Sequence, residues 1–179
     1  MQKLIIIRGH SGSGKTTFAL EKITEFQQSY PMGIVFHIEN DHFLTINGIY
    51  RWTVECFQIA KQQAQLKLNQ AFEFCQQHKT QDVLIVISNV GGNLKEIEHI
   101  IEIAEQYYLQ VSIYRLQNFF INTHQVDQQT VYEMYIHLCE SPIENEILLE
   151  PIQPMTVKVR SEIEKLWDLK RKNRYTKKM

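Results

Sequence analysis

The amino-acid sequence predicts an α/β protein in which helices flank a mostly parallel central sheet in three layers. Two observations predict this class. Short runs rich in β-branched residues alternate along the chain with longer segments in which apolar residues have a helical spacing. The short runs are almost continuously apolar, as expected for strands buried on both faces of a parallel sheet. The alternation is typical of right-handed β-α-β units, because a crossover helix must join each pair of parallel strands.

Four strands are expected from these apolar runs. The sequences are LIII, IVFHI, VLIVI and VSIY, at residues 4–7, 34–38, 83–87 and 111–114. A short fifth strand is expected at VKV, which begins at Val157. Enrichment in Val and Ile favours strand over helix in all five segments.

Helices are expected between and after the strands. Three of them run from Thr16 to about Gln28, from Trp52 to about Gln77 and from Leu94 to about Tyr108. Apolar residues recur every three or four positions in the second and third, which places one apolar stripe of each helix in the core. A further helix is expected from Gln128 to Cys139, and another from Ser161, which opens a Ser-x-x-Glu capping box.

Length and charge indicate one domain with a basic end. A chain of 179 residues fits a single domain, here assigned to residues 1–169. Residues 170–179 carry six basic and no acidic residues, and we expect them to form a flexible tail. Without those six, 13 of the 19 basic residues remain against 20 acidic ones, so the body of the protein is acidic.

Other compositional features exclude several classes of protein. Cys56, Cys75 and Cys139 lie far apart without a CxxC or Cys/His cluster, so they predict neither a disulfide framework nor a zinc site. No apolar run approaches the roughly 20 residues of a membrane span, and the first eight residues do not form a secretory signal. We therefore expect a cytoplasmic protein without a membrane partner.

The motif GHSGSGKT follows the first predicted strand and precedes the first predicted helix. It matches the P-loop pattern G-x-x-x-x-G-K-[ST], and that context is the one in which the pattern binds nucleotides. Glycines let successive N–H groups converge on phosphate oxygens, and the helix adds its positive end. The predicted nucleotide-binding residues are Gly9, His10, Ser11, Gly12, Ser13, Gly14, Lys15, Thr16 and Thr17.

Two P-loop side chains have specific expected roles. Lys15 can reach the β- and γ-phosphates of ATP, and the Thr16 hydroxyl can ligate Mg²⁺. Asp41 stands just beyond the second strand, at the edge of a parallel sheet where ligands bind. There it could accept the proton of an acceptor hydroxyl, but an Asp after a strand is also a common turn or N-cap residue.

Several segments together resemble a known family. The sequences IIIRGHSGSGKTT, ENDHF, GIYRW, VLIVISNVGG and FINTHQVDQQTVYEMY are similar to those of P-loop kinases of the polynucleotide 5′-hydroxyl kinase type, which include related AAA-like ATPases. The resemblance covers roughly residues 1–138. It implies a P-loop NTPase fold, a kinase that uses ATP and Mg²⁺, and a role for Asp41 as the general base that activates a 5′-hydroxyl.

The chain departs from that family at three positions. His42 stands where a second acidic residue is frequent, and SNVG, from Ser88, replaces an Asp-containing sequence. Ile121 replaces the arginine of a lid motif, of which Asn122 and His124 remain. An absent lid cation is costly, since such an arginine is worth on the order of 10³ to 10⁵ in rate.

Two arginines could replace the missing lid cation, and an aromatic segment could form a channel for the acceptor. Arg115 or Arg51 could supply the charge, although Arg115 could equally pair with surface carboxylates. In GIYRW, Tyr50 and Trp52 could stack on an acceptor base or pack at the start of a helix.

Three functions follow as hypotheses. The first is an ATP-dependent kinase that phosphorylates the 5′-hydroxyl of a nucleic acid or a nucleotide-like acceptor. The second is a small-molecule or nucleotide-sugar kinase similar to zeta toxins, which the acidic body favours because polynucleotide binders normally display a basic surface. The third is a catalytically degenerate ATP-binding regulatory module, which Ser88 and Ile121 favour.

Overall fold

The central sheet has five strands that all run in the same direction. The computed structural model describes residues 1–46, 49–50, 52–121 and 126–176. Within them the sheet has the strand order β2-β5-β1-β6-β7, and each neighbouring pair is parallel. The bounds are β1 Gln2–Arg8, β2 Ile34–Ile38, β5 Val83–Ile87, β6 Gln110–Arg115 and β7 Ile147–Leu148. The predicted α/β class with a mostly parallel sheet is confirmed.

Strand β1 lies at the centre of the sheet and fixes where a ligand can bind. Ile5 pairs with Val86 of β5 on one side and with Ser112 of β6 on the other. The chain leaves β1 toward β2, whereas β6 and β7 add to the opposite side. The loop after β1 therefore lies at the point where the strand order reverses, outside the carboxyl ends of the strands.

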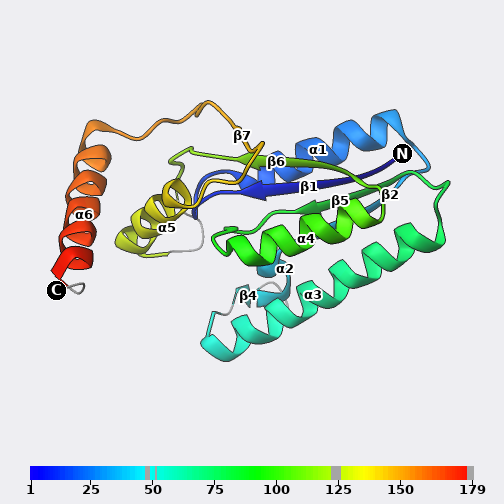
Figure 1. The fold of residues 1–179 in the computed structure, drawn as a ribbon, viewed down its shortest axis with the longest axis horizontal. Coiled ribbons are helices and arrows are strands. Elements are labelled where there is room, and N and C mark those ends of the chain that lie inside the picture. The colour runs from blue at the N-terminus through cyan, green and yellow to red at the C-terminus, as the bar shows by residue number, and fades with distance from the viewer. Residues whose placement is uncertain (47–48, 51, 122–125, 177–179) are drawn as a thin grey trace.

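Helices cover both faces of the sheet and complete the three layers. Helix α1 (Lys15–Ser29) lies on one face, and α3 (Val54–Gln77) and α4 (Leu94–Gln106) lie on the other (Figure 1). Alternate side chains of β1 explain this arrangement. Leu4 and Ile6 pack into the core beneath α3 and α4, whereas Ile5 and Ile7 pack into the core beneath α1.

Short elements follow β2 at the carboxyl edge of the sheet. Helix α2 (Asn40–Leu44) comes directly after β2, and the two-stranded hairpin of β3 (Thr45–Ile46) and β4 (Ile49–Tyr50) leads toward α3. The side chain of Leu44 is buried, which anchors α2 to the body of the protein.

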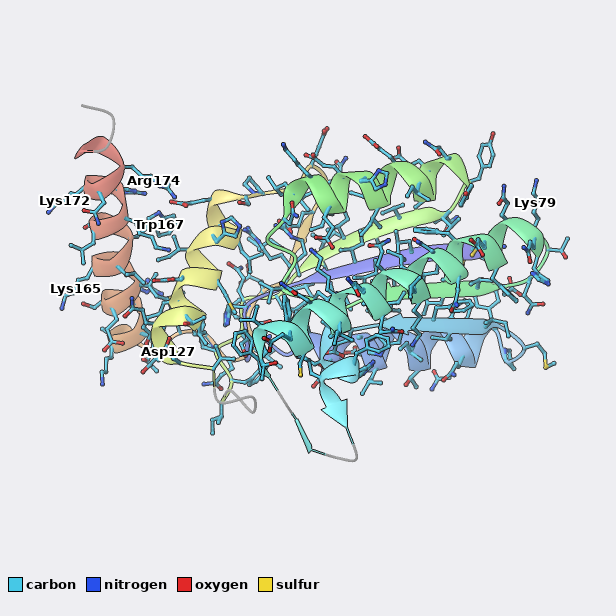
Figure 2. All side chains as sticks on the ribbon, turned by 90° about the horizontal axis from the view of Figure 1, so that it is seen from below. Lys79, Asp127, Lys165, Trp167, Lys172 and Arg174 are labelled. Atoms are coloured by element: carbon cyan, nitrogen blue, oxygen red, sulfur yellow. The ribbon has the colours of Figure 1, made fainter. Side chains whose placement is uncertain are left out.

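Helices α5 (Gln128–Glu140) and α6 (Val157–Thr176) pack together beyond the carboxyl ends of β1 and β6 (Figure 1). Trp167 and Arg174 point from α6 toward α5, where both donate hydrogen bonds to Glu140, at 2.8 Å and 2.7 Å (Figure 2). Lys165 and Lys172 point away from α5. In the part of the chain that the structure describes, no helix has the length and apolar character of a membrane span.

The segment from Val157 differs from its prediction. The sequence VKV forms the first turn of α6, so the predicted fifth strand there is wrong, and the fifth strand is β7. The backbone N–H of Val159 donates to the Thr156 hydroxyl at 3.3 Å, so Thr156 supplies the cap and the helix begins four residues before Ser161. Helix α6 also includes the first residues of the basic segment, as far as Thr176, and residues 177–179 lie outside the described residues.

Candidate active site

The P-loop joins β1 to α1 and depends on its glycines. Gly12 and Gly14 have φ angles of 78° and 89°, in the left-handed region that residues with a Cβ avoid. At Gly9 the constraint is space, because an added Cβ would lie 2.3 Å from the Ser13 Oγ and 3.1 Å from the Leu116 carbonyl oxygen. The loop therefore takes a compact shape that brings backbone N–H groups together.

Helix α1 presents its positive end to the same place. Its first intrahelical bond runs from the Phe18 N–H to the Gly14 carbonyl, at 3.0 Å. The N–H groups of Lys15, Thr16 and Thr17 precede that bond and have no acceptor within the helix. Such groups at a helix N-terminus bind phosphate.

The ammonium group of Lys15 lies across the P-loop. Its Nζ donates to the His10 carbonyl oxygen at 3.0 Å. Burial lowers the pKa of Lys15, while the nearby carboxylates of Glu39 and Asp41 oppose that shift. The Lys15 ammonium group thus lies near two carboxylates.

Glu39 is a site residue that sequence reasoning missed. It immediately follows β2, it is only 4% exposed, and its Oε1 accepts a hydrogen bond of 2.7 Å from the Thr16 hydroxyl. A hydroxyl and a carboxylate at this distance are oxygen donors of the kind that Mg²⁺ prefers. The signal in the sequence was a second carboxylate two residues before Asp41, at the end of the same strand.

Asp41 lies in the first turn of α2 and lines the same cleft as Lys15 and Thr16. The turn is closed by the backbone, since the His42 N–H donates to the Glu39 carbonyl at 3.2 Å. The assignment of Asp41 as general base stays a prediction.

The residues after β5 form hydrogen bonds with the end of β2 and the residues that follow it. Ser88 is buried and its hydroxyl shares a hydrogen bond of 2.8 Å with His37 Nε2. The Asn89 side chain accepts a bond of 2.9 Å from the Asn40 N–H. Burial lowers the pKa of His37 to about 4, and the neighbouring His42 and Lys67 act in the same direction. The imidazole of His37 is therefore neutral at pH 7.

The segment after β6 holds the P-loop from the other side. Asn118 donates to the Ser13 carbonyl at 3.1 Å, and the Phe120 N–H donates to the Gly12 carbonyl at 3.0 Å. Ile121, where the sequence resemblance predicts a lid arginine, is 93% exposed at the margin of the cleft. Asn122 and His124 lie outside the described residues.

Arg115 is held in an ion-pair network. Its Nε lies 3.3 Å from Glu146 Oε2, and its Nη1 donates to the Leu138 carbonyl at 2.7 Å. Arg8, the residue before the P-loop, contacts the other carboxylate oxygen of Glu146. Arg115 therefore pairs with a carboxylate. This was the alternative to the suggestion that Arg115 replaces the missing lid cation. Arg51, the other suggested cation, lies outside the described residues.

His10 contributes its backbone to the P-loop rather than a solvent-facing side chain. The ring is buried and packs against Phe119 and Tyr135, with centroids 4.4 Å and 5.8 Å away. Burial lowers its pKa to about 4. The carbonyl oxygen, in contrast, receives the hydrogen bond of Lys15.

A cleft of about 1260 Å³ extends from the P-loop to the space between α3 and α4. Trp52 and Phe57 line it, with ring centroids 6.5 Å apart, and Lys61 forms a 2.9 Å ion pair with Glu96 across its α3 and α4 walls. Trp52 is exposed, so it is available to a ligand. The placement of the Tyr50 side chain is outside the described part of the chain.

Comparison with known proteins identifies a close relative and a shared fold. No family model matches the chain. It is 62% identical over 179 residues to the uncharacterized protein PM0531 of Pasteurella multocida, with full coverage of both chains. Among solved structures, Chaetomium thermophilum Kti12 in complex with ADP-AlF3 has a TM-score of 0.51 at 10% identity, covering 92% of this chain and 97% of that one.

A second solved structure has the same fold. A putative kinase from Chloroflexus aurantiacus has a TM-score of 0.50 at 15% identity, covering 96% of this chain and 98% of the other. At such identities these likenesses show the fold alone. The chain thus has the fold of the P-loop NTPases, and it belongs to the same family as the PM0531 protein of Pasteurella multocida.

Proposed function

We propose that the protein is an ATP-dependent kinase that transfers the γ-phosphate of ATP to a hydroxyl group. One observation carries this proposal: Lys15, Thr16, Glu39 and Asp41 line a single cleft whose floor is the glycine-rich loop. A cation, two oxygen ligands suited to a metal ion and a candidate base thereby line the same cleft, which supports a role in phosphoryl transfer. Positioning and charge stabilisation supply most of phosphoryl-transfer catalysis.

Each side chain has a role that its surroundings support. The P-loop N–H groups and Lys15 bind the phosphates, and Thr16 with Glu39 holds Mg²⁺, which neutralises charge on the phosphate oxygens when bound. Asp41 accepts the proton of the acceptor hydroxyl as its oxygen attacks the γ-phosphorus. The bond from that phosphorus to the bridging oxygen breaks, and ADP is the leaving group.

The charges of the cleft favour a small acceptor. The described residues that line it include two lysines and five carboxylates, which are Lys15, Lys61, Glu21, Glu39, Asp41, Glu96 and Glu150. A polynucleotide carries a charge on every phosphate and is normally bound by a basic surface. The acceptor we favour is therefore a small hydroxyl compound, including a nucleotide sugar, that enters between α3 and α4.

One feature supports the 5′ end of a nucleic acid as a second candidate. Trp52 and Phe57 offer aromatic faces at the α3 side of the cleft, and bases stack on such faces with about 1–3 kcal/mol each. A single terminal nucleotide could stack there while the rest of the strand stays in solvent.

The experiment is transfer of labelled γ-phosphate from ATP to a panel of sugars, nucleosides, nucleotide sugars and 5′-hydroxyl DNA and RNA. Asp41→Asn is expected to lower the rate on the true acceptor by about 10²- to 10⁴-fold, while ATP affinity stays within a few-fold. The matched control is Asp168→Asn, an exposed aspartate on α6, which should leave the rate unchanged.

Other outcomes would refute the proposal in different ways. Full activity of Asp41→Asn would exclude Asp41 as the base. Tight ATP binding that depends on Lys15, with neither transfer nor hydrolysis across the panel, would select the regulatory module instead.

A further inference from the structure

Two histidines and a glutamate meet where β2 ends. His42 Nε2 lies 3.4 Å from Glu39 Oε2, and His37 Nε2 lies 3.6 Å from the same oxygen. The three potential ligand atoms all lie within 4.8 Å of one another. His37 lies in β2, Glu39 follows that strand and His42 lies in α2, so residues 37–42 present all three ligands.

These separations are close to those of a tetrahedral metal site. Zinc binds imidazole nitrogen and carboxylate oxygen at about 2.0–2.2 Å, which places neighbouring ligands of a tetrahedron about 3.3–3.6 Å apart. Both separations from Glu39 Oε2 match that value. Only the distance between the two histidines must shorten, and the His42 side chain is 47% exposed and can turn.

Glu39 supplies an independent reason for a cation here. Its Oε1 accepts the Thr16 hydrogen bond, but its Oε2 is buried and has no hydrogen-bond partner among the described residues. Leaving a buried charged oxygen without a hydrogen-bond donor is energetically costly. A metal ion bound to Oε2 would remove that cost.

We propose that His37, Glu39 and His42 form a binding site for Zn²⁺ or a similar late transition-metal ion. Imidazole nitrogens suit Zn²⁺, whereas Mg²⁺ prefers oxygen ligands, so the site discriminates between these two ions. Two histidines and one glutamate leave a fourth coordination position of a tetrahedral ion open. The site does not depend on the proposed kinase activity.

The surroundings of His37 position its ring for this role. The Lys67 ammonium donates to the His37 carbonyl at 2.6 Å, which anchors the backbone. The Ser88 hydroxyl occupies His37 Nε2 at 2.8 Å and must give up that bond when a metal ion binds. Ser88 therefore competes with the metal, and Ser88→Ala is expected to bind zinc at least as tightly as the wild type.

Glu39 joins this site to the P-loop. One carboxylate oxygen faces Thr16 and the other faces the histidines. The two cation positions are thus distinct but share a ligand, and zinc would lie directly beside the phosphate-binding side of the cleft.

The test is zinc titration of protein without a histidine tag, by calorimetry or by competition with a chromophoric chelator, in the presence of excess Mg²⁺. We expect one zinc ion per chain, with affinity at least about tenfold weaker in His42→Ala. The matched control is His99→Ala. His99 is 70% exposed and also lies three residues from a carboxylate, with Nδ1 3.8 Å from Glu102 Oε2, so its loss should change the affinity less than twofold.

A spectroscopic readout shows which residue touches the metal. With Co²⁺ in place of zinc, the wild type should give the intense visible bands of a tetrahedral ion. His42→Cys should add a thiolate-to-cobalt charge-transfer band in the near ultraviolet. The proposal is overturned if the wild type binds no zinc at one equivalent, if His42→Ala binds it as the wild type does, or if His42→Cys gives no thiolate band.

Discussion

Replacing Glu146 by glutamine is expected to destabilise the protein strongly. The Glu146 carboxylate lies between two arginines: Arg8 contacts one oxygen and Arg115 the other. The side chains of Arg8 and Glu146 are almost fully buried, and burial lowers the pKa of Arg8 while Glu146 opposes that shift. Glutamine has the same size but no charge, so the substitution leaves two arginine cations close together without their shared counter-ion.

The size of the effect follows from the burial of these groups. Removing one partner of a buried ion pair costs about 3–5 kcal/mol, because the remaining charge stays out of water. Unfolding entropy is about 2.1 cal/mol/K per residue, or about 0.4 kcal/mol/K for this chain. The expected fall in melting temperature is therefore about 8–13 °C.

Urea-induced unfolding, followed by circular dichroism and tryptophan fluorescence, measures this loss, and calorimetry measures the shift in melting temperature. The matched control is Glu25→Gln on α1, where Glu25 is exposed and pairs with Lys22 at 2.8 Å. Exposed pairs contribute at most about 1 kcal/mol. If Glu146→Gln loses no more stability than Glu25→Gln, the Arg8 and Arg115 charges do not depend on Glu146 and the reasoning fails.

Two further predictions concern the P-loop and acid stability. Burial holds the pKa of His10 at about 4, against 6.5 for an ordinary histidine, so between these values the unfolded chain binds more protons. Stability should be full above about pH 6.5 and fall as the pH drops toward 4, by about 2 kcal/mol from His10 at pH 5. Urea unfolding across this range tests the slope, and a flat profile would contradict it. Gly9→Ala should reduce stability by about 1–3 kcal/mol and weaken ATP binding, since its Cβ would meet Ser13 and Leu116. Unchanged ATP affinity by calorimetry would show that the loop relaxes freely.

The sheet could be predicted where strands carry continuous apolar runs. All five residues of β5 are buried, and such segments leave little choice of structure. Strand β7 could not be found in the same way, because Ile147 and Leu148 are exposed and pair only with the end of β6. A strand of two residues has no periodicity to detect.

The strand predicted at Val157 was wrong for a different reason. Its β-branched residues favour a strand, but Val157 is exposed and no strand in the described part of the chain pairs with it, while Thr156 caps a helix there. Helix-capping and tertiary packing outweighed intrinsic propensity, which is a weak preference.

In the candidate site too, a local motif could be found from the sequence, whereas residues brought together by the fold could not. The P-loop is a local motif that the sequence pattern alone identifies, and the binding of a nucleotide by its residues stays a prediction. Glu39 gains its role from Thr16, which lies 23 residues earlier and meets it only after β1 and β2 enter one sheet. The cluster of His37, Glu39 and His42 likewise depends on how α2 turns after β2, and the scattered cysteines gave no hint of a metal site.

The contacts between the P-loop and the segment after β6 have a thermodynamic consequence. Asn118 holds Ser13 and also accepts the Gln153 N–H at 3.1 Å, so the loop is tied to the segment that leads into α6. The conformational entropy of the loop is thereby lost during folding and not when a ligand arrives. Preorganisation of this kind raises affinity without any added contact. It also means that a partner displacing Gln153 would loosen the phosphate-binding loop from a distance.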